Sequence, residues 1–393
     1  MKKKLAIITT HPVQYNAPLF SLLQGRGNID IHVFYTWGEE AKDSKYDPGF
    51  AADVQWDIPL LQGYPFSFVE NKAKRKGSDH FWGINNPGII NQVIAFKPDA
   101  ILVYGWSFKS HFDVLRYFKK RVPVLFRGDS TMLDAKRSFK SLARKIFLKW
   151  VYRHIDMALY TGKSNYAYFK AAGLANRQLV FVPHAVDNGR FVERLLTNPG
   201  ADPSFRSSLN IDATDFVFLF SGKLEIKKSP ELLVQAFCES GFGKNVHLVL
   251  AGSGPLGKSL GSQYAHHPQI HFTGFVNQSL VPALYYCADV VVLPSAGPGE
   301  SWGLAINEAM ACSRPVIVSD RCGCAADLVQ DNVNGYVFMS GNKADLQAKM
   351  QRIYGMGKNI IEMGKASLKI INEYSLEKAA AGIENTVMNI APK

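Results

Sequence analysis

The segment Val290–Ala311 constrains the fold of this chain most, because it joins three kinds of local structure in a fixed order. It opens with the apolar run Val290–Leu293, which is typical of a strand buried on both faces of a parallel sheet. A loop of small residues follows, and then a helix-forming segment that is mostly apolar except at Glu308. Glycines between a strand and a helix let backbone N–H groups approach an anion, so the segment predicts a phosphate site.

Two glutamates frame this predicted anion site. Glu300 lies just before the helix start, and Glu308 lies on its second turn. As helix, the step of eight residues from one glutamate to the other would span about 12 Å, roughly the reach from one end of a nucleotide diphosphate sugar to the other. A carboxylate beside a phosphate is unfavourable, so we expect both acids to accept hydrogen bonds from hydroxyl groups. The local chemistry indicates a sugar nucleotide.

Strand-like and helix-like segments alternate along both halves of the chain. The expected strands of the first half are 5–9, 31–35, 100–104, 122–126, 157–160 and 180–182. Those of the second half are 216–220, 246–251, 270–273, 290–293, 316–319 and 336–338. This alternation predicts an α/β fold with two Rossmann-like, doubly wound parallel sheets, in which ligands bind beyond the carboxyl ends of the strands.

The length of 393 residues allows two domains, each with its own core. A turn-rich connection is expected at 198–203, where Pro and Gly cluster. We place an N-terminal domain at 1–195, a C-terminal domain at 196–375 and a final helical segment at 376–393.

Several short segments of the second half follow one another in an informative order. They are Ser221–Ser229, Ala251–Leu256, Phe272–Val276, the Glu-x7-Glu pair 300–308, Gly323 and Asn334-Gly335. In this order they resemble the donor site of retaining glycosyltransferases of family 4 (glycosyl transferases group 1), which have the GT-B fold. The resemblance is dense from about 216 to 336 and weak before 160. It implies an N-terminal acceptor domain, a C-terminal donor domain facing it across a cleft, and a final helix that returns to the first domain.

The resemblance also implies an activity, which is sugar transfer from a nucleotide-diphosphate sugar, with UDP favoured, to a glycan or lipid-linked acceptor in envelope polysaccharide synthesis. Glu300 would contact the donor sugar, Glu308 the ribose hydroxyls, and Phe275 and Val276 would border the nucleobase. The remaining expected donor positions, chiefly phosphate contacts, are Gly222, Gly254, Ser301, Trp302, Gly303 and Leu304. The Trp302 side chain could instead pack in the core, and this alternative stays open.

A leaving diphosphate requires positive charge, and here lysines can supply it. No Asp-x-Asp motif occurs in the chain, so a metal held by that motif is not expected. Lys223 and Lys228 follow the strand 216–220 and are expected to neutralise the diphosphate together with a helix N-terminus. The family more often has Arg at the first of these positions, whereas Lys227 is expected to face solvent. We therefore expect neither a metal nor a cofactor beyond the sugar-nucleotide co-substrate.

The first domain departs from the family pattern, so its candidate residues rest on their positions at strand ends. His11–Asn16 replaces the usual Gly-Gly turn, and Arg127–Ser130 stands where many members have a His. Asp129 could assist deprotonation of an acceptor hydroxyl or could simply pair with Arg127. The acceptor candidates are His11, Gln14, Tyr15, Trp106 and Arg127, whereas His184 is expected to be structural. No residue is recognisable as a nucleophile, which fits a mechanism in which the leaving phosphate helps to take the acceptor proton.

Positive charge is concentrated in the first half. Residues 1–200 contain 29 Lys and Arg against 16 Asp and Glu, whereas residues 201–393 contain 16 against 17. No zinc finger or RNP-like motif is present, so we expect an anionic membrane surface rather than nucleic acid as the partner. In the basic segment 136–153 we expect the apolar stripe to pack on the sheet and the bases to attract the membrane. The stripe is Phe139, Leu142, Ala143, Ile146, Phe147 and Trp150.

The five cysteines lie in the second half and are odd in number, which argues against a disulfide framework and for a reducing cytoplasm. Cys322 and Cys324 lack a second ligand pair, so no metal site is expected there. No apolar stretch is long enough to span a bilayer, and the run 5–8 is better explained by a strand than by a leader. We expect a cytoplasmic location, peripheral on the inner membrane face. Two alternatives stay open: a GT-B sugar-nucleotide epimerase or hydrolase, and a non-catalytic sugar-nucleotide-binding partner.

Overall fold

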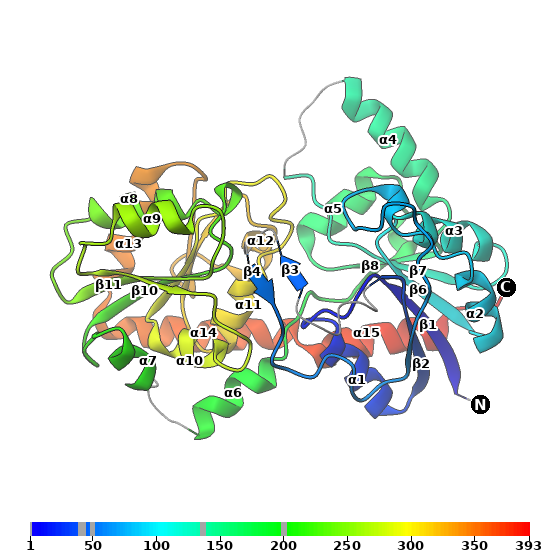
Figure 1. Ribbon diagram of the computed structural model, residues 1–393, viewed down its shortest axis with the longest axis horizontal. Coiled ribbons are helices and arrows are strands. Elements are labelled where there is room, and N and C mark those ends of the chain that lie inside the picture. Colours follow the sequence, from blue (N-terminus) through cyan, green and yellow to red (C-terminus); the bar gives the residue numbers. More distant parts are fainter. Residues whose placement is uncertain (1, 38–44, 48–51, 134–138, 198–202) are drawn as a thin grey trace. The chain divides into compact units, whose positions relative to one another are not determined.

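The computed structural model describes residues 2–37, 45–47, 52–133, 139–197 and 203–393, which form two units (Figure 1). The first unit comprises Met1–Asp43, Pro59–His184 and Leu376–Lys393, and the second comprises Ser44–Ile58 and Ala185–Ser375. Most of the predicted connection at 198–203 lies outside the described residues. The long segment of the second unit begins at Ala185, eleven residues before the predicted start at 196, because helix α6 (Asn188–Thr197) packs on helices of the second unit and buries Phe191 there.

The first unit is built on a seven-stranded, all-parallel sheet with the strand order β5-β2-β1-β6-β7-β8-β9. Its strands are β1 (Lys3–Thr9), β2 (Ile29–Tyr35), β5 (Phe66–Phe68), β6 (Ala100–Tyr104), β7 (Val124–Arg127), β8 (Met157–Tyr160) and β9 (Leu179–Phe181). Its helices are α1 (Ala17–Arg26), α2 (Ile89–Phe96), α3 (Lys109–Phe118), α4 (Phe139–Tyr152), α5 (Lys163–Ala171) and α15 (Leu376–Asn389). Apolar residues of β1, β6 and β7 are fully buried, as expected for central strands.

The C-terminal helix α15 belongs to this first unit, where it packs on α1 and β1. Arg26 Nε lies 2.9 Å from Glu384 Oε2, an acid that is almost completely buried. Lys3 donates from its Nζ to the carbonyl oxygens of Val387, Met388 and Ile390, each at 3.1 Å. A cation at these last carbonyls also complements the negative end of the helix dipole, so Lys3 stabilises the end of the helix.

The second unit contains a six-stranded, all-parallel sheet with the order β12-β11-β10-β13-β14-β15. Its strands are β10 (Phe216–Ser221), β11 (Val246–Ala251), β12 (Ile270–Gly274), β13 (Val290–Leu293), β14 (Val316–Ser319) and β15 (Gly335–Phe338). The helices besides α6 are α7 (Pro203–Ser208), α8 (Pro230–Cys238), α9 (Gly257–Gln263), α10 (Val281–Cys287), α11 (Leu304–Ala311), α12 (Ala325–Leu328), α13 (Lys343–Tyr354) and α14 (Ile360–Ile371). The strands β3 (Lys45–Asp47) and β4 (Ala52–Val54) form a separate antiparallel pair.

The predicted α/β class with two parallel sheets is confirmed, and every predicted strand is present within a few residues of its expected bounds. The three-residue strands β3, β4 and β5 were not predicted, because runs this short carry little apolar periodicity. All five cysteines are free thiols, as expected. Within the described ranges, no helix combines the length and apolarity needed to cross a membrane.

The prediction that the apolar stripe of the segment 136–153 packs on the sheet is wrong for the part of the stripe that the structure describes. Helix α4 buries Leu148, Val151 and Tyr152, and it leaves Ile146 and Phe147 on the surface. Both sets recur at helical spacing, so periodicity alone could not decide which face meets the sheet. Residues 136–138 and the side chains of Phe139, Lys140 and Leu142 lie outside the described part of the chain.

Candidate functional site

Most predicted donor-site residues lie on loops that follow the carboxyl ends of β10, β11, β12 and β13 in the second unit. Backbone hydrogen bonds join these loops, with Gly222 N donating to Ala251 O at 2.9 Å and Gly252 N donating to Gly274 O at 2.8 Å. Gly252 has a φ of +135°, and a Cβ at this position would collide with the Gly222 carbonyl oxygen. Only glycine allows this close approach of two loops. The sheet edge is thus a continuous backbone surface of the kind that binds nucleotides in doubly wound folds.

Lys228 and Glu300 form the most strongly buried ion pair of this edge among the described residues. The Lys228 Nζ bonds to Glu300 Oε2, and the side chains are only 17% and 9% exposed. Ser295 Oγ donates to the same carboxylate oxygen at 3.0 Å. The two loops are further joined by a hydrogen bond from Ala296 N to Lys227 O at 2.8 Å. The pair therefore places one cation and one carboxylate side by side, where an anionic ligand and its hydroxyl groups could replace each as partner.

The neighbouring lysines differ from Lys228 in their surroundings. Lys227 is 40% exposed and lies 3.3 Å from Glu225, so its predicted orientation toward solvent agrees with the structure. Lys223 is half-buried and follows Gly222 directly at the end of β10. The structure therefore brings Lys223 and Lys228 to the same end of one strand.

The helix after β13 begins later than the sequence suggested. Helix α11 starts at Leu304, and Gly303 before it has a φ of +104°. The assumption that the chain is helical from Glu300 to Glu308 is therefore wrong, because residues 300–303 lie in the preceding loop. This loop packs on the next one along the chain, where Gly323 N donates to Glu300 O at 3.1 Å.

Glu308 is buried on α11, and its Oε2 accepts a hydrogen bond from the Tyr285 hydroxyl at 2.8 Å. Tyr285 was not predicted as a site residue, because nothing in its local sequence marks it. The side chain of Trp302 packs in the core, with Nε1 donating to Asn307 Oδ1 at 2.7 Å. The alternative of core packing therefore holds for this ring, and only the backbone of Trp302 remains a predicted phosphate contact.

Phe275 and Val276, the predicted nucleobase neighbours, are half-buried after β12. The ring of Trp56 lies 6.1 Å from the ring of Phe275. The segment 55–57, to which Trp56 belongs, also binds the loop that follows Phe275 and Val276. Asn277 Nδ2 donates to Gln55 O at 2.7 Å, and Ser279 N donates to Asp57 Oδ1 at 3.0 Å. Sequence reasoning missed this segment, because it lies more than two hundred residues away in the half assigned to the acceptor.

The predicted acceptor residues lie in the first unit, and Arg127 is almost completely buried there. Its two terminal nitrogens donate to the carbonyl oxygens of Val182 and Pro183, both at 2.9 Å. These bonds hold the turn after β9 and favour a structural role for Arg127. Asp129 is exposed in the loop after β7. Burial lowers the pKa of His184 to about 4, with the Arg127 charge adding to this shift and the Asp129 charge opposing it.

The other acceptor candidates follow β1 and β6. His11 Nδ1 lies 3.0 Å from Thr10 Oγ1, and Gln14 and Tyr15 are half-buried in the same loop. Trp106 is half-buried after β6. Tyr104, which was not among the candidates, has a buried hydroxyl without a hydrogen-bond partner in the described part of the chain. Such a hydroxyl costs free energy unless a ligand or water satisfies it, so Tyr104 joins the candidates.

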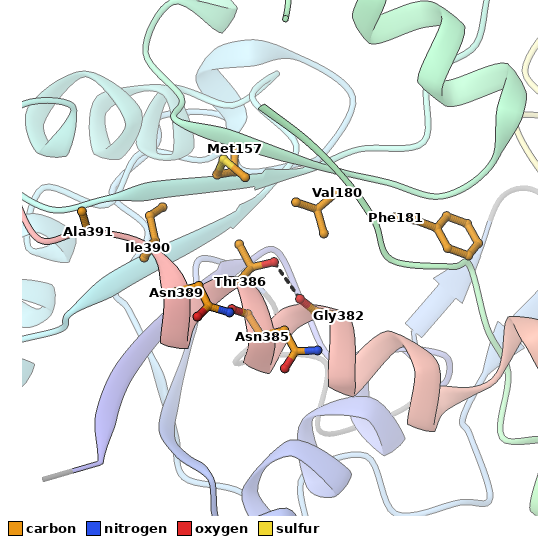
Figure 2. A pocket seen from close by; sticks show the side chains of 9 residues that line it. All are labelled: Met157, Val180, Phe181, Gly382, Asn385, Thr386, Asn389, Ile390 and Ala391. Carbon is orange, nitrogen blue, oxygen red and sulfur yellow. Dashed lines mark hydrogen bonds between the residues drawn. The ribbon is translucent and has the colours of Figure 1, made fainter. Parts of the chain in front are cut away.

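An open groove of about 630 Å³ lies in the first unit between α15 and strands β8 and β9 (Figure 2). Its lining is Met157, Val180, Phe181, Gly382, Asn385, Thr386, Asn389, Ile390 and Ala391. None of the predicted donor or acceptor residues is among them, and no charged side chain lines the groove. The groove therefore lacks the chemistry expected of a sugar-nucleotide site.

The geometry of the second unit agrees with a comparison of its sequence with known families. Residues 202–369 match the family model of the glycosyl transferases group 1. This segment of the chain is therefore similar to the glycosyl transferases group 1.

Individual proteins resemble this chain over part of its length. An uncharacterized glycosyltransferase of Methanocaldococcus jannaschii is 31% identical over 183 residues, which are 45% of this chain and 46% of that relative. A D-inositol 3-phosphate glycosyltransferase of Segniliparus rotundus is 28% identical over 211 residues, which are 51% of this chain and 45% of that relative. The matches thus span about half the length of these curated relatives.

Solved structures resemble this chain over nearly its whole length. HepE of Anabaena, crystallised with UDP and glucose, has a TM-score of 0.70 at 17% identity, covering 99% of this chain and 100% of that one. WaaG, a glycosyltransferase involved in lipopolysaccharide biosynthesis, has a TM-score of 0.68 at 14% identity, covering 98% and 100%. At this identity the likeness shows the fold alone, and the fold is GT-B.

Proposed function

We propose that this protein is a glycosyltransferase that moves a sugar from a nucleotide-diphosphate sugar to an acceptor hydroxyl. The observation that carries the proposal is the buried Lys228–Glu300 pair, which lies at the carboxyl edge of a parallel sheet, and Lys223 follows the same strand as Lys228. In this proposal the two lysines bind the diphosphate, and Glu300, freed from Lys228, accepts hydrogen bonds from the donor sugar.

Bond cleavage would place growing negative charge on the leaving diphosphate. Lys223, Lys228 and the N-terminus of α11 supply positive charge in a largely buried site, where it stabilises the developing anion more than it would in water. We propose that these groups suffice without a divalent metal. The leaving phosphate would then take the acceptor proton on the same face of the sugar, with retention of configuration, and Asp129 could assist that transfer.

The remaining parts of the proposal concern substrates and location. A UDP-sugar is favoured, and the solved HepE complexes with UDP support this choice for a protein of the same fold. A glycan or lipid-linked acceptor of envelope polysaccharide synthesis is favoured because the first 200 residues carry the excess positive charge that an anionic membrane attracts. The enzyme would then act in the cytoplasm at the inner membrane face.

The test is the dependence of donor turnover on acceptor. Purified protein is incubated in chelator with a panel of nucleotide sugars, with and without membrane-extracted lipid-linked glycans, and nucleoside diphosphate release is measured. We expect release that rises with acceptor and a product whose anomeric configuration, read by NMR, matches the donor. Release that does not change with acceptor would instead favour an epimerase or hydrolase. Binding of a donor without any turnover would favour the non-catalytic partner.

A further inference from the structure

Helix α4 of the first unit presents large apolar side chains to solvent. Ile146 is 66% exposed, Phe147 45% and Trp150 38%. A single exposed apolar residue is common on protein surfaces, but three on adjacent turns of one helix form a patch. The opposite face of the helix packs on the unit, so this patch is not required for the core.

Basic residues surround the exposed apolar patch on the same helix. Arg144, Lys145 and Lys149 are exposed, and the Arg153 guanidinium lies 5.7 Å from the centre of the Trp150 ring. No Asp or Glu occurs between residues 135 and 155. The exposed side of the helix therefore combines apolar groups with unbalanced positive charge, which is the combination found in helices that lie at anionic membrane surfaces.

A row of aromatic rings leads from this helix toward the predicted acceptor residues. The rings of Phe147 and Trp150 lie 5.8 Å apart, and Phe112 lies 5.2 Å from Trp150. At the other end, Phe147 lies 5.5 Å from Trp106, which follows β6 and is an acceptor candidate. The row thus connects the exposed patch with the carboxyl end of the first sheet, within one unit.

We propose that this aromatic–basic surface docks on an anionic lipid bilayer. The surface comprises Trp106, Arg144, Lys145, Ile146, Phe147, Lys149 and Trp150. Ile146 and Phe147 would enter the interface between headgroups and acyl chains, while the lysines and arginine would meet anionic headgroups. A bilayer fits better than a nucleic acid because the most exposed apolar group, Ile146, is aliphatic and has no ring on which a base could stack.

A consequence for the acceptor rests on the proposed function. If the protein glycosylates a lipid-linked acceptor, docking through α4 brings Trp106 to the membrane surface, where the acceptor headgroup lies. The aromatic–basic surface would then determine which acceptors are reached, while leaving donor binding in the second unit unaffected.

The experiment is co-sedimentation of the full chain with vesicles of phosphatidylcholine alone or mixed with phosphatidylglycerol. The double variants I146S/F147S and K145Q/K149Q test the apolar and the charged components. Ile361→Ser is the control, because Ile361 is 58% exposed on α14 and belongs to the second unit rather than to this surface. We expect binding only to phosphatidylglycerol vesicles, weakened about tenfold in each double variant and unchanged in the control.

Several outcomes would overturn the docking proposal. They are equal binding to both vesicle types, unchanged binding of both double variants, or stronger binding to a single-stranded oligonucleotide that the same substitutions weaken. Matching melting temperatures will show that the variants are folded. The rise in melting temperature on adding donor, measured in the same samples, separates the two proposals. If donor does not stabilise the wild type, the proposed function is contradicted. The docking proposal is still tested by the vesicle binding alone.

Discussion

Lys228 and Glu300 form an ion pair in the second unit, although they follow different strands, β10 and β13. A few residues away, Lys227 pairs with Glu225 in a much more exposed setting. An exposed pair contributes about 0–1 kcal/mol to stability, whereas removing one partner of a buried pair leaves a charge that is costly to bury. Adjacent lysines therefore form a buried pair and a surface pair, and the surface pair provides a matched control.

The substitution Lys228→Ala is expected to abolish donor stabilisation and to lower the free energy of unfolding by about 1–3 kcal/mol, because Glu300 would remain nearly buried without its cation. Lys227→Ala should change both quantities little. The double variant Lys228→Ala/Glu300→Ala is expected to recover stability but not donor binding, as measured by denaturant unfolding and calorimetry. Recovery of donor binding in the double variant would show that Lys228 acts only through Glu300.

The Glu308 carboxylate is expected to recognise the ribose of the donor. Wild-type protein should then bind a ribonucleoside diphosphate more tightly than its 2′-deoxy analogue, by roughly 1 kcal/mol for one hydrogen bond. Glu308→Gln should reduce this preference, and Glu239→Gln, on the surface of the same unit, should retain it. An unchanged preference in the Glu308 variant, measured by calorimetry, would place the ribose elsewhere.

Asp57 is expected to affect donor affinity through the loop that follows Phe275. Asp57→Ala removes the hydrogen bonds to Ser279, so the loop at the predicted nucleobase end loses an anchor. We expect a several-fold weaker affinity for the nucleoside diphosphate, since each lost hydrogen bond costs about 1 kcal/mol. Glu70→Ala, an exposed acid of the first unit, is the control. Equal affinities for both variants would limit the segment 55–57 to a structural role.

Acid should destabilise the first unit through His111. Burial lowers the pKa of His111 from its ordinary 6.5 to about 4, although its ring donates to the Tyr104 carbonyl. Between pH 6.5 and about 4 the unfolded chain therefore binds more protons, and stability falls as the pH falls, by up to about 1.4 kcal/mol per pH unit for one histidine. His111→Gln should show a shallower decline in denaturant unfolding across this window. An identical slope would mean that other histidines account for the effect.

The sequence predicted the two sheets well, because buried parallel strands are continuous apolar runs such as Val290–Leu293. It also predicted that Lys223 and Lys228 lie at one strand end, because their positions follow directly from the end of β10. The contacts it missed depend on tertiary structure. Trp56 meets Phe275 across a long sequence separation, and α4 has two apolar faces of equal helical period, of which packing selects one.

The most direct test of the account is the melting temperature of purified protein with a panel of nucleotide-diphosphate sugars in the presence of chelator, using wild type, Lys228→Ala and Lys227→Ala. A ligand that binds only the folded state must raise the melting temperature. We predict that donors of one nucleotide base stabilise the wild type and Lys227→Ala but not Lys228→Ala. Equal stabilisation of all three proteins, or stabilisation that requires added metal, would contradict the assignment of Lys228 as the cation that binds the diphosphate.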